Sequence, residues 1–245
     1  MNITAWIFSE MRRKEGNSMV TGIFGAGLPE ILTELPRGAV VCMVGAGGKT
    51  TLLHMLAEFY RENGFHVLAG TTTHMEKPEK LCISPAAAIR EMTASGIAFA
   101  GLPDPENGKK IISLPEEKLR TAVKAADYTF LEADGARRMP VKVPYSHEPV
   151  LPPYTTHVVS VGGMHAVGKP AGVISYNREG VIRFLEEHFS GRTAIGETTP
   201  LTEEMLCCIV RRAYEEKVRD AAPHAELIPV LHELSGGGTG LWRSI

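Results

Sequence analysis

The segment VVCMVGAGGKTTLLHML, residues 40–56, constrains the fold more than any other part of the chain. Residues 39–44 form a continuous apolar run rich in β-branched side chains, which is typical of a parallel strand buried on both faces. After three glycines the apolar side chains recur with helical spacing, at Leu52, Met55, Leu56 and Phe59. The segment therefore predicts a strand, a glycine-rich loop and a helix in that order.

This loop departs from the usual phosphate-binding pattern G-x-x-x-x-G-K-[ST], because Met43 stands where the first glycine belongs. A strand that leads through glycines into a helix still directs backbone N–H groups and the positive end of the helix dipole to one point. An anion is expected there. The predicted phosphate-binding residues of the loop are Gly45, Ala46, Gly47, Gly48, Lys49, Thr50 and Thr51.

Each residue type in the loop has a role in this prediction. Gly45, Gly47 and Gly48 permit positive φ and close backbone approach. Lys49 can reach β- and γ-phosphate oxygens from the surface, and the Thr50 hydroxyl is placed to bind Mg²⁺. A glycine-rich turn beside a solvated lysine is the alternative.

The segment LEADG, residues 131–135, ends a predicted strand over 128–133 and supplies Glu132 and Asp134 on one side of that strand. With Thr50 they form the predicted Mg²⁺ site, and with Lys49 the predicted catalytic group. Two solvated acids at a strand end are the alternative. Hydroxyls of Thr72 and Thr73 are expected near the γ-phosphate, although threonine also simply suits strands.

Further strands are expected over 65–69, 157–161 and 226–231, and helices from Ser84-Pro85 and over 116–126, 178–189 and 203–219. Residues 97–102 and 110–114 predict a small β-hairpin insertion with its turn near Asn107-Gly108. This alternation predicts an α/β fold, a mainly parallel sheet sandwiched by helices and similar to P-loop NTPases. The expected domains are an N-terminal extension (1–27), one nucleotide-binding domain (28–234) and a flexible tail (235–245).

Five prolines within residues 139–154 predict a loop, since this segment suits neither a helix nor a central strand. Charged side chains gather in it and just before it. A site for an anionic substrate or a partner is one interpretation, and a solvated charged loop is the other. The candidate residues are Arg137, Arg138, Lys142, His147 and Glu148, the last two also as an acid/base pair.

Composition narrows the classes of partner. Lys and Arg number 26 against 28 Asp and Glu, for a net charge of −2, so neither nucleic acid nor an anionic membrane is an expected partner. The four cysteines lack C-x-x-C spacing, which favours a reducing compartment and excludes a zinc site of that type. No 18-residue apolar run and no signal-peptide pattern occur, so we expect a cytoplasmic protein.

Four motifs taken together, VGAGGKTT, TTTHMEKP, LEADGARRMPVKVPYSHEPVLP and VGG..AVGKP, resemble the YqeC family from about residue 28 to the last strand. The resemblance implies an accessory protein for selenium-dependent molybdenum hydroxylases, with a nucleotide-dependent step in their maturation. It implies Mg²⁺ with ATP or GTP, and a molybdenum hydroxylase or molybdopterin cofactor as partner. The shortened loop is also similar to the G-T-N-G-K-T loop of Mur ligases, whose E-A-D segment resembles Glu132-Ala133-Asp134.

The last predicted strand departs from the family pattern. It ends in Leu231-His232-Glu233-Leu234 where the pattern has an Asn-Lys-x-Asp-like ending, so no strong guanine preference is expected. Three functions remain open from the sequence. They are NTP hydrolysis, Mur-like transfer or phosphorylation of a small anionic acceptor, and nucleotide-gated carriage of a molybdopterin cofactor without catalysis.

Overall fold

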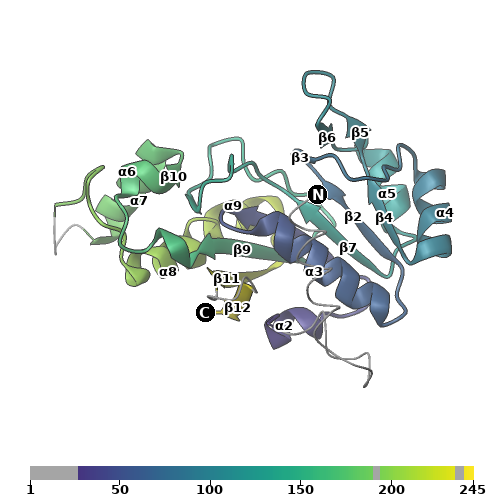
Figure 1. The fold of residues 1–245 in the computed structure, drawn as a ribbon, viewed down its shortest axis with the longest axis horizontal. Coiled ribbons are helices and arrows are strands. Elements are labelled where there is room, and N and C mark those ends of the chain that lie inside the picture. The colour runs from purple at the N-terminus through teal and green to yellow at the C-terminus, as the bar shows by residue number, and fades with distance from the viewer. Residues whose placement is uncertain (1–26, 190–193, 235–239) are drawn as a thin grey trace.

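The computed structural model describes residues 27–189, 194–234 and 240–245. Within these residues, seven strands form a central sheet in the order β12-β11-β9-β1-β7-β2-β4 (Figure 1). All neighbours are parallel except β11 and β12, which are antiparallel. The strands are β1 (Val40–Gly45), β2 (Val67–Thr71), β4 (Ile97–Ala100), β7 (Tyr128–Glu132), β9 (His157–Gly163), β11 (Glu226–Leu234) and β12 (Gly240–Ser244).

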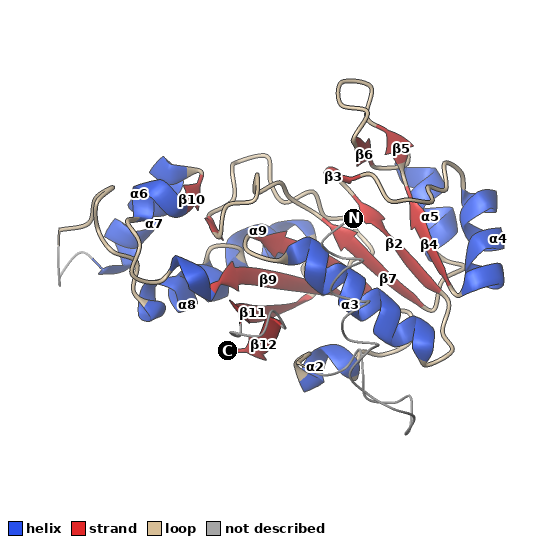
Figure 2. Ribbon diagram, in the orientation of Figure 1, coloured by secondary structure: helices blue, strands red, loops and turns tan. Residues whose placement is uncertain are grey.

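Helices cover both faces of this sheet, as Figure 2 shows in blue against red. Side chains of β1 alternate between the faces, with Val41 and Met43 in the cluster that includes α2 (Glu30–Thr33) and α3 (Lys49–Glu62). Val40, Cys42 and Val44 face the opposite cluster. Its helices are α4 (Pro85–Ser95), α5 (Glu116–Val123) and α9 (Glu215–Ala221). The predicted α/β class, with a mostly parallel sheet between helices, is confirmed.

A third apolar cluster lies beyond β9 and β11 and includes Val141 and Leu231. It is built on α6 (Ala171–Ile174), α7 (Arg178–Phe189) and α8 (Glu203–Arg212). Here β8 (Val141–Lys142) pairs with β10 (Ser175–Tyr176), and a 3-10 turn, η1 (Met164–Ala166), follows β9. None of the helices described is both long and apolar enough to cross a membrane.

The expected hairpin is present in part. β5 (Leu102–Pro103) pairs antiparallel with β6 (Lys110–Ile112), which also pairs with β3 (His74–Glu76). Residues 97–100, expected in the hairpin, instead form β4 at the edge of the main sheet. Gly101 separates the two strands, and a Cβ there would lie 2.8 Å from both the Ile111 side chain and the Ile112 carbonyl oxygen.

Two further expectations differ from the structure. The helix predicted over 203–219 is two helices, α8 and α9, because the chain turns at Tyr214 and buries its side chain to 1% exposure. Part of the expected flexible tail is the strand β12, whose Trp242 is buried. Residues 235–239 of that tail, and residues 1–26 of the expected extension, lie outside the described residues.

Candidate phosphate-binding site

The glycine-rich loop leaves β1 at Gly45 and enters α3 at Lys49. Gly45, Gly47 and Gly48 have φ values of 88°, 83° and 138°, a region that L side chains rarely adopt. A Cβ at Gly45 would lie 2.3 Å from the Val161 carbonyl oxygen, so β9 also requires glycine there. The predicted positive φ and close backbone approach at these glycines are confirmed.

The amino end of α3 is suited to an anion. Its N-cap, Gly48, has no side chain to accept hydrogen bonds from the first turn, and that turn contains no acidic residue. The first N–H groups of a helix have no acceptor within the helix, and the helix dipole adds positive potential at the same point. Lys49 and Thr50 stand in this first turn.

Lys49 lies inward and is only 6% exposed. Its Nζ donates a 2.5 Å hydrogen bond to the Gly45 carbonyl oxygen and lies 2.9 Å from Oδ1 of Asp134. The expectation that Lys49 is a surface group is therefore wrong, because the buried carboxylate of Asp134 draws the ammonium group under the loop.

Asp134 is fully buried and holds several parts of the site together. Its Oδ2 accepts hydrogen bonds from the Tyr214 hydroxyl at 2.6 Å and from the Gly45 N–H at 3.0 Å. Lys142 Nζ lies 3.3 Å from the same oxygen. Burial and the adjacent Asp134 carboxylate raise the pKa of Tyr214 well above its usual value, so the phenol stays protonated and donates.

Lys142 and Glu148 are buried and form an ion pair, with 2.7 Å between Nζ and Oε2. Lys142 also donates to the Gly135 carbonyl oxygen, while Glu148 accepts from the backbone N–H groups of Gly135 and Tyr145, each at 3.2 Å. The interpretation of this segment as a solvated charged loop is therefore wrong for these two residues. Lys49 and Lys142 supply the buried positive charge that Asp134 needs, and Glu148 balances the second ammonium group.

The other charged residues of that segment remain accessible. Arg137, Arg138 and His147 are exposed, and Arg138 pairs with Glu76. His147 stacks on Tyr145 with 5.8 Å between ring centroids. Within the described residues no hydrogen bond joins His147 to Glu148, so the structure does not form the expected acid/base pair.

Thr50 and Glu132, two of the three predicted metal ligands, are in direct contact. The Thr50 hydroxyl donates a 2.5 Å hydrogen bond to Oε1 of Glu132, the last residue of β7. β7 is the parallel neighbour of β1, so the carboxylate and the loop meet at one edge of the sheet. Burial raises the pKa of Glu132, while Lys49 and Thr50 act in the opposite direction. Such a carboxylate gains from a bound cation.

The pair suits Mg²⁺, which is usually held by one or two carboxylates together with phosphate oxygens and water. Within the described residues no group of three or more His, Cys, Asp and Glu side chains is arranged to hold a metal by itself. A metal at Thr50 and Glu132 would therefore depend on ligands from the nucleotide.

The threonines after β2 face the same region. Thr71 donates to the Glu132 carbonyl oxygen at 2.9 Å, and Thr72 donates to the Val150 carbonyl oxygen at 2.7 Å. The Thr73 hydroxyl is buried and has no hydrogen-bond partner within the described residues. Thr51, by contrast, is exposed on α3. Among the predicted hydroxyls in the described residues, that of Thr73 is buried and lacks an acceptor.

An aromatic pair that the sequence did not predict covers the loop from the β11 side. His232 and Trp242 stack with 4.1 Å between ring centroids and 12° between planes, and His232 Nδ1 lies 2.9 Å from the Gly47 carbonyl oxygen. A Cβ at Gly48 would lie 2.6 Å from Trp242 Cη2 and 2.8 Å from His232 Nδ1. Burial lowers the pKa of His232, which favours the neutral ring.

The part of the chain that is similar to known proteins contains most residues of this site. Residues 41–177, more than half of the chain, match the family described as YqeC protein. The chain belongs to the YqeC family. The matched range contains the glycine-rich loop, Glu132, Asp134, Lys142 and Glu148, while Tyr214, His232 and Trp242 lie beyond it.

A relative from Escherichia coli (strain K12), named "Uncharacterized protein YqeC", is 36% identical over 149 residues. The alignment covers 58% of this chain and 58% of the relative, so the chain spans little more than half the length of this YqeC protein. No solved structure matches the chain.

Proposed function

We propose that this YqeC protein binds a Mg²⁺-nucleoside triphosphate at the glycine-rich loop and hydrolyses it, in the manner of a P-loop NTPase. The observation that carries the proposal is the contact between Thr50 and Glu132 beside the uncapped amino end of α3. A hydroxyl and a buried carboxylate next to the N–H groups at the start of a helix form an arrangement that suits a Mg²⁺-phosphate complex.

The residues have distinct roles in this proposal. Backbone N–H groups at the start of α3 hold the phosphates, and Lys49 leaves Asp134 to bind a phosphate oxygen. Thr50 and Glu132 would hold Mg²⁺, which would supply positive charge to the phosphate oxygens. Asp134 is already bonded to Lys49, Lys142, Tyr214 and Gly45, so it positions Lys49 and the loop rather than the metal.

The nucleotide is ATP or GTP. Its base would lie towards β11, where Nδ1 of His232 is held by the Gly47 carbonyl oxygen and the ring is stacked on Trp242. The energy of hydrolysis would serve the maturation of a selenium-dependent molybdenum hydroxylase, as the sequence resemblance implies. The exposed Arg137, Arg138 and His147 are the proposed contact for that partner or for an anionic molybdopterin cofactor.

The decisive experiment measures nucleotide binding and phosphate release by the wild type and by Lys49→Ala, with the exposed Lys124→Ala as a matched control. We expect Lys124→Ala to behave as wild type and Lys49→Ala to lose binding of both Mg²⁺-ATP and Mg²⁺-GTP. Because Lys49 is buried against Asp134, its loss also lowers the free energy of unfolding by about 3–5 kcal/mol. Circular dichroism therefore has to show that the variant is folded at the assay temperature.

Unchanged titration of both nucleotides by folded Lys49→Ala would reject the loop as the binding site. Binding without phosphate release by the wild type would reject hydrolysis and favour a nucleotide-gated carrier. Release of the nucleoside diphosphate only in the presence of an acceptor would favour a Mur-like transferase or kinase, the alternative supported by the cavity that Thr50 helps to line.

A further inference from the structure

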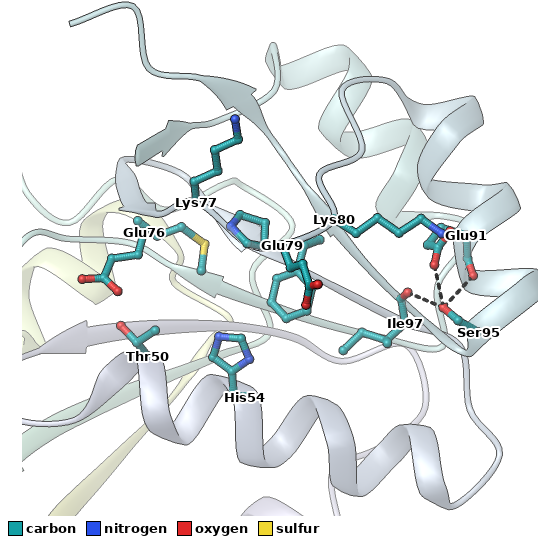
Figure 3. A pocket seen from close by; sticks show the side chains of 12 residues that line it. Thr50, His54, Glu76, Lys77, Glu79, Lys80, Glu91, Ser95 and Ile97 are labelled. Atoms are coloured by element: carbon teal, nitrogen blue, oxygen red, sulfur yellow. Dashed lines mark hydrogen bonds and ion pairs between the residues drawn. The ribbon is translucent and has the colours of Figure 1, made fainter. Parts of the chain in front are cut away.

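A cavity of about 350 Å³ adjoins the phosphate-binding loop, a size found for small-molecule sites. It lies between α3, the segment 75–80 that begins within β3, and the α4 and β4 elements (Figure 3). The mechanism proposed above does not use it, apart from Thr50 at one end. The segment 75–80 forms one side of its lining. The other side comes from α3, α4 and β4 and consists of Thr50, His54, Glu91, Ser95, Ile97 and Phe99.

One wall of the cavity is aromatic and apolar. His54 lies against Phe99 with 5.0 Å between ring centroids and 30° between planes, and Met75 and Ile97 adjoin them in the lining. Aromatic rings of this kind pack well against a planar ligand, and a thioether adapts to its outline. The wall therefore favours a flat ring over a flexible chain.

Most charged groups at the rim are already paired. Lys80 pairs with Glu91, and Glu76 pairs with Arg138. Within the described part of the chain, no hydrogen bond or ion pair engages the ring nitrogens of His54 or the carboxylate of Glu79. Figure 3 shows both side chains pointing into the cavity, while Lys77 extends away from α3.

These two free groups define the polar chemistry of a ligand. Burial lowers the pKa of His54, and a neutral imidazole presents one donor and one acceptor. Glu79 is an acceptor only when ionised. A ligand that donates N–H groups fits both, whereas an anionic ring would be repelled by Glu79.

From the position of Thr50 we infer that a ligand in the cavity would not be the base of the nucleotide bound at the loop. This step rests on the proposed function. Thr50 and His54 are one helical turn apart on the same face of α3, and Thr50 with Glu132 marks the metal-bearing end of the triphosphate. That end faces the cavity. The base then extends the opposite way, towards the His232–Trp242 side of the loop.

We propose that the cavity binds a second ligand, an uncharged planar nitrogen heterocycle that donates N–H groups to Glu79, stacks on His54 and Phe99, and points one substituent at Thr50. The ligand class follows from the flat wall, the unpaired carboxylate and the absence of an unpaired cation pointing into the cavity in the described chain. The protein would then bind two ligands, the nucleotide at the loop and the heterocycle in the cavity.

The test titrates the full chain with three amino-bearing nucleosides, adenosine, guanosine and cytidine, which lack phosphate and so avoid the loop. Purine riboside, which lacks the amino group of adenosine, is the matched probe. We expect at least one of the three to bind with a Kd of about 1 mM or tighter. Loss of the N–H donor in purine riboside should weaken binding about tenfold relative to adenosine if adenosine is the ligand bound.

The variants locate the site. Glu79→Ala and His54→Leu should each weaken nucleoside binding about tenfold, while the exposed Glu106→Ala and His224→Leu leave it unchanged. Lys49→Ala should abolish nucleotide binding and keep nucleoside binding, and Mg²⁺-ADP should not displace the nucleoside. If nucleotide binding fails while nucleosides still bind in a Glu79-dependent manner, the proposed function falls and the cavity site stands.

Three results would overturn the inference. The first is that none of the three nucleosides binds, and the second is binding that neither Glu79→Ala nor His54→Leu weakens. The third is displacement of the nucleoside by Mg²⁺-ADP, or a tenfold loss of ATP affinity in His54→Leu, because the cavity would then hold the base of the loop-bound nucleotide.

Discussion

The Thr50 hydroxyl and the Glu132 carboxylate are bonded to each other at 2.5 Å although 82 residues separate them in the chain. One stands in the first turn of α3 and the other at the end of β7, so the bond joins the helix that follows the loop to the neighbouring strand. Both groups are oxygen ligands of the kind that Mg²⁺ prefers, and they meet beside the predicted phosphate site.

We predict that Glu132→Gln keeps the Thr50 hydrogen bond, because an amide oxygen also accepts, but weakens Mg²⁺-dependent nucleotide binding by about 10- to 100-fold. The exposed Glu117→Gln is the matched control. Titrations of ATP with and without Mg²⁺ measure the effect. Equal Mg²⁺ dependence in Glu132→Gln and wild type would remove Glu132 from the metal site.

The same variant tests the electrostatics of the folded protein. Burial raises the pKa of Glu132 above its unfolded value, so the unfolded state releases this proton first as pH rises. The free energy of unfolding should therefore fall as pH rises from about 4.5 through the raised pKa, and Glu132→Gln should lack this contribution. Urea denaturation at several pH values provides the measurement, and parallel curves for the two proteins would contradict it.

Gly48→Ala and Gly64→Ala form a matched pair for the contact between the loop and its aromatic cover. Both glycines have positive φ, 84° at Gly64 and a more strained 138° at Gly48. A Cβ at Gly64 would have no atom within 4 Å, whereas one at Gly48 would meet Trp242 and His232. We expect Gly64→Ala to cost about 1–2 kcal/mol from backbone strain. Gly48→Ala should cost more and also weaken nucleotide binding. Equal losses in the two variants would show that the aromatic pair adapts freely.

His232 should make the protein less stable in mild acid. Its pKa is lowered from 6.5 in the folded state, mainly by burial, so the unfolded state binds more protons as pH falls below about 6.5. The free energy of unfolding should fall over this range, and His232→Gln should reduce the slope. His54, His157 and His165 act in the same direction, so the reduction is partial. The exposed His224→Gln is the control, and identical slopes in all three proteins would exclude His232.

ATP and GTP should bind within about tenfold of each other, or about 1.4 kcal/mol. Strong guanine selection needs a carboxylate and an amide dedicated to the base, and β11 offers His232, already bonded to Gly47, and the exposed Glu233. Competition titrations at equal Mg²⁺ measure the ratio. A hundredfold GTP preference that is lost in Glu233→Ala would show that Glu233 reads guanine.

Local sequence patterns correctly predicted the structural features that depend on residues close together in the chain. The apolar run of β1, the Ser84 cap of α4 and the positive φ of the loop glycines depend on a few neighbouring residues, and all are present. The proximity of Thr50 and Glu132 was predictable from the sequence, because each follows or ends a parallel strand and the carboxyl ends of parallel strands share one edge of a sheet.

The incorrect expectations concern residues whose positions depend on distant partners. Helical periodicity across 203–219 gives no sign that the chain turns so that Tyr214 can bond to Asp134. A polar segment rich in proline looks exposed, yet Lys142 is buried because it pairs with Asp134, and Glu148 is buried because it pairs with Lys142. Likewise, no short-range pattern indicates that Trp242 pairs with His232, or that Glu79 and His54 face one cavity.

Under the proposed function, the ion pair between Lys49 and Asp134 makes nucleotide binding an exchange of one partner of Lys49 for another. An incoming anion does not meet a free ammonium group, since it must displace a buried carboxylate that then keeps its ion pair with Lys142 and its hydrogen bond from Tyr214. A monovalent anion such as chloride or acetate offers Lys49 no more than Asp134 already provides. Only a ligand that also binds the helix terminus and carries several charges gains from the exchange, so the loop discriminates by charge density before any base is recognised.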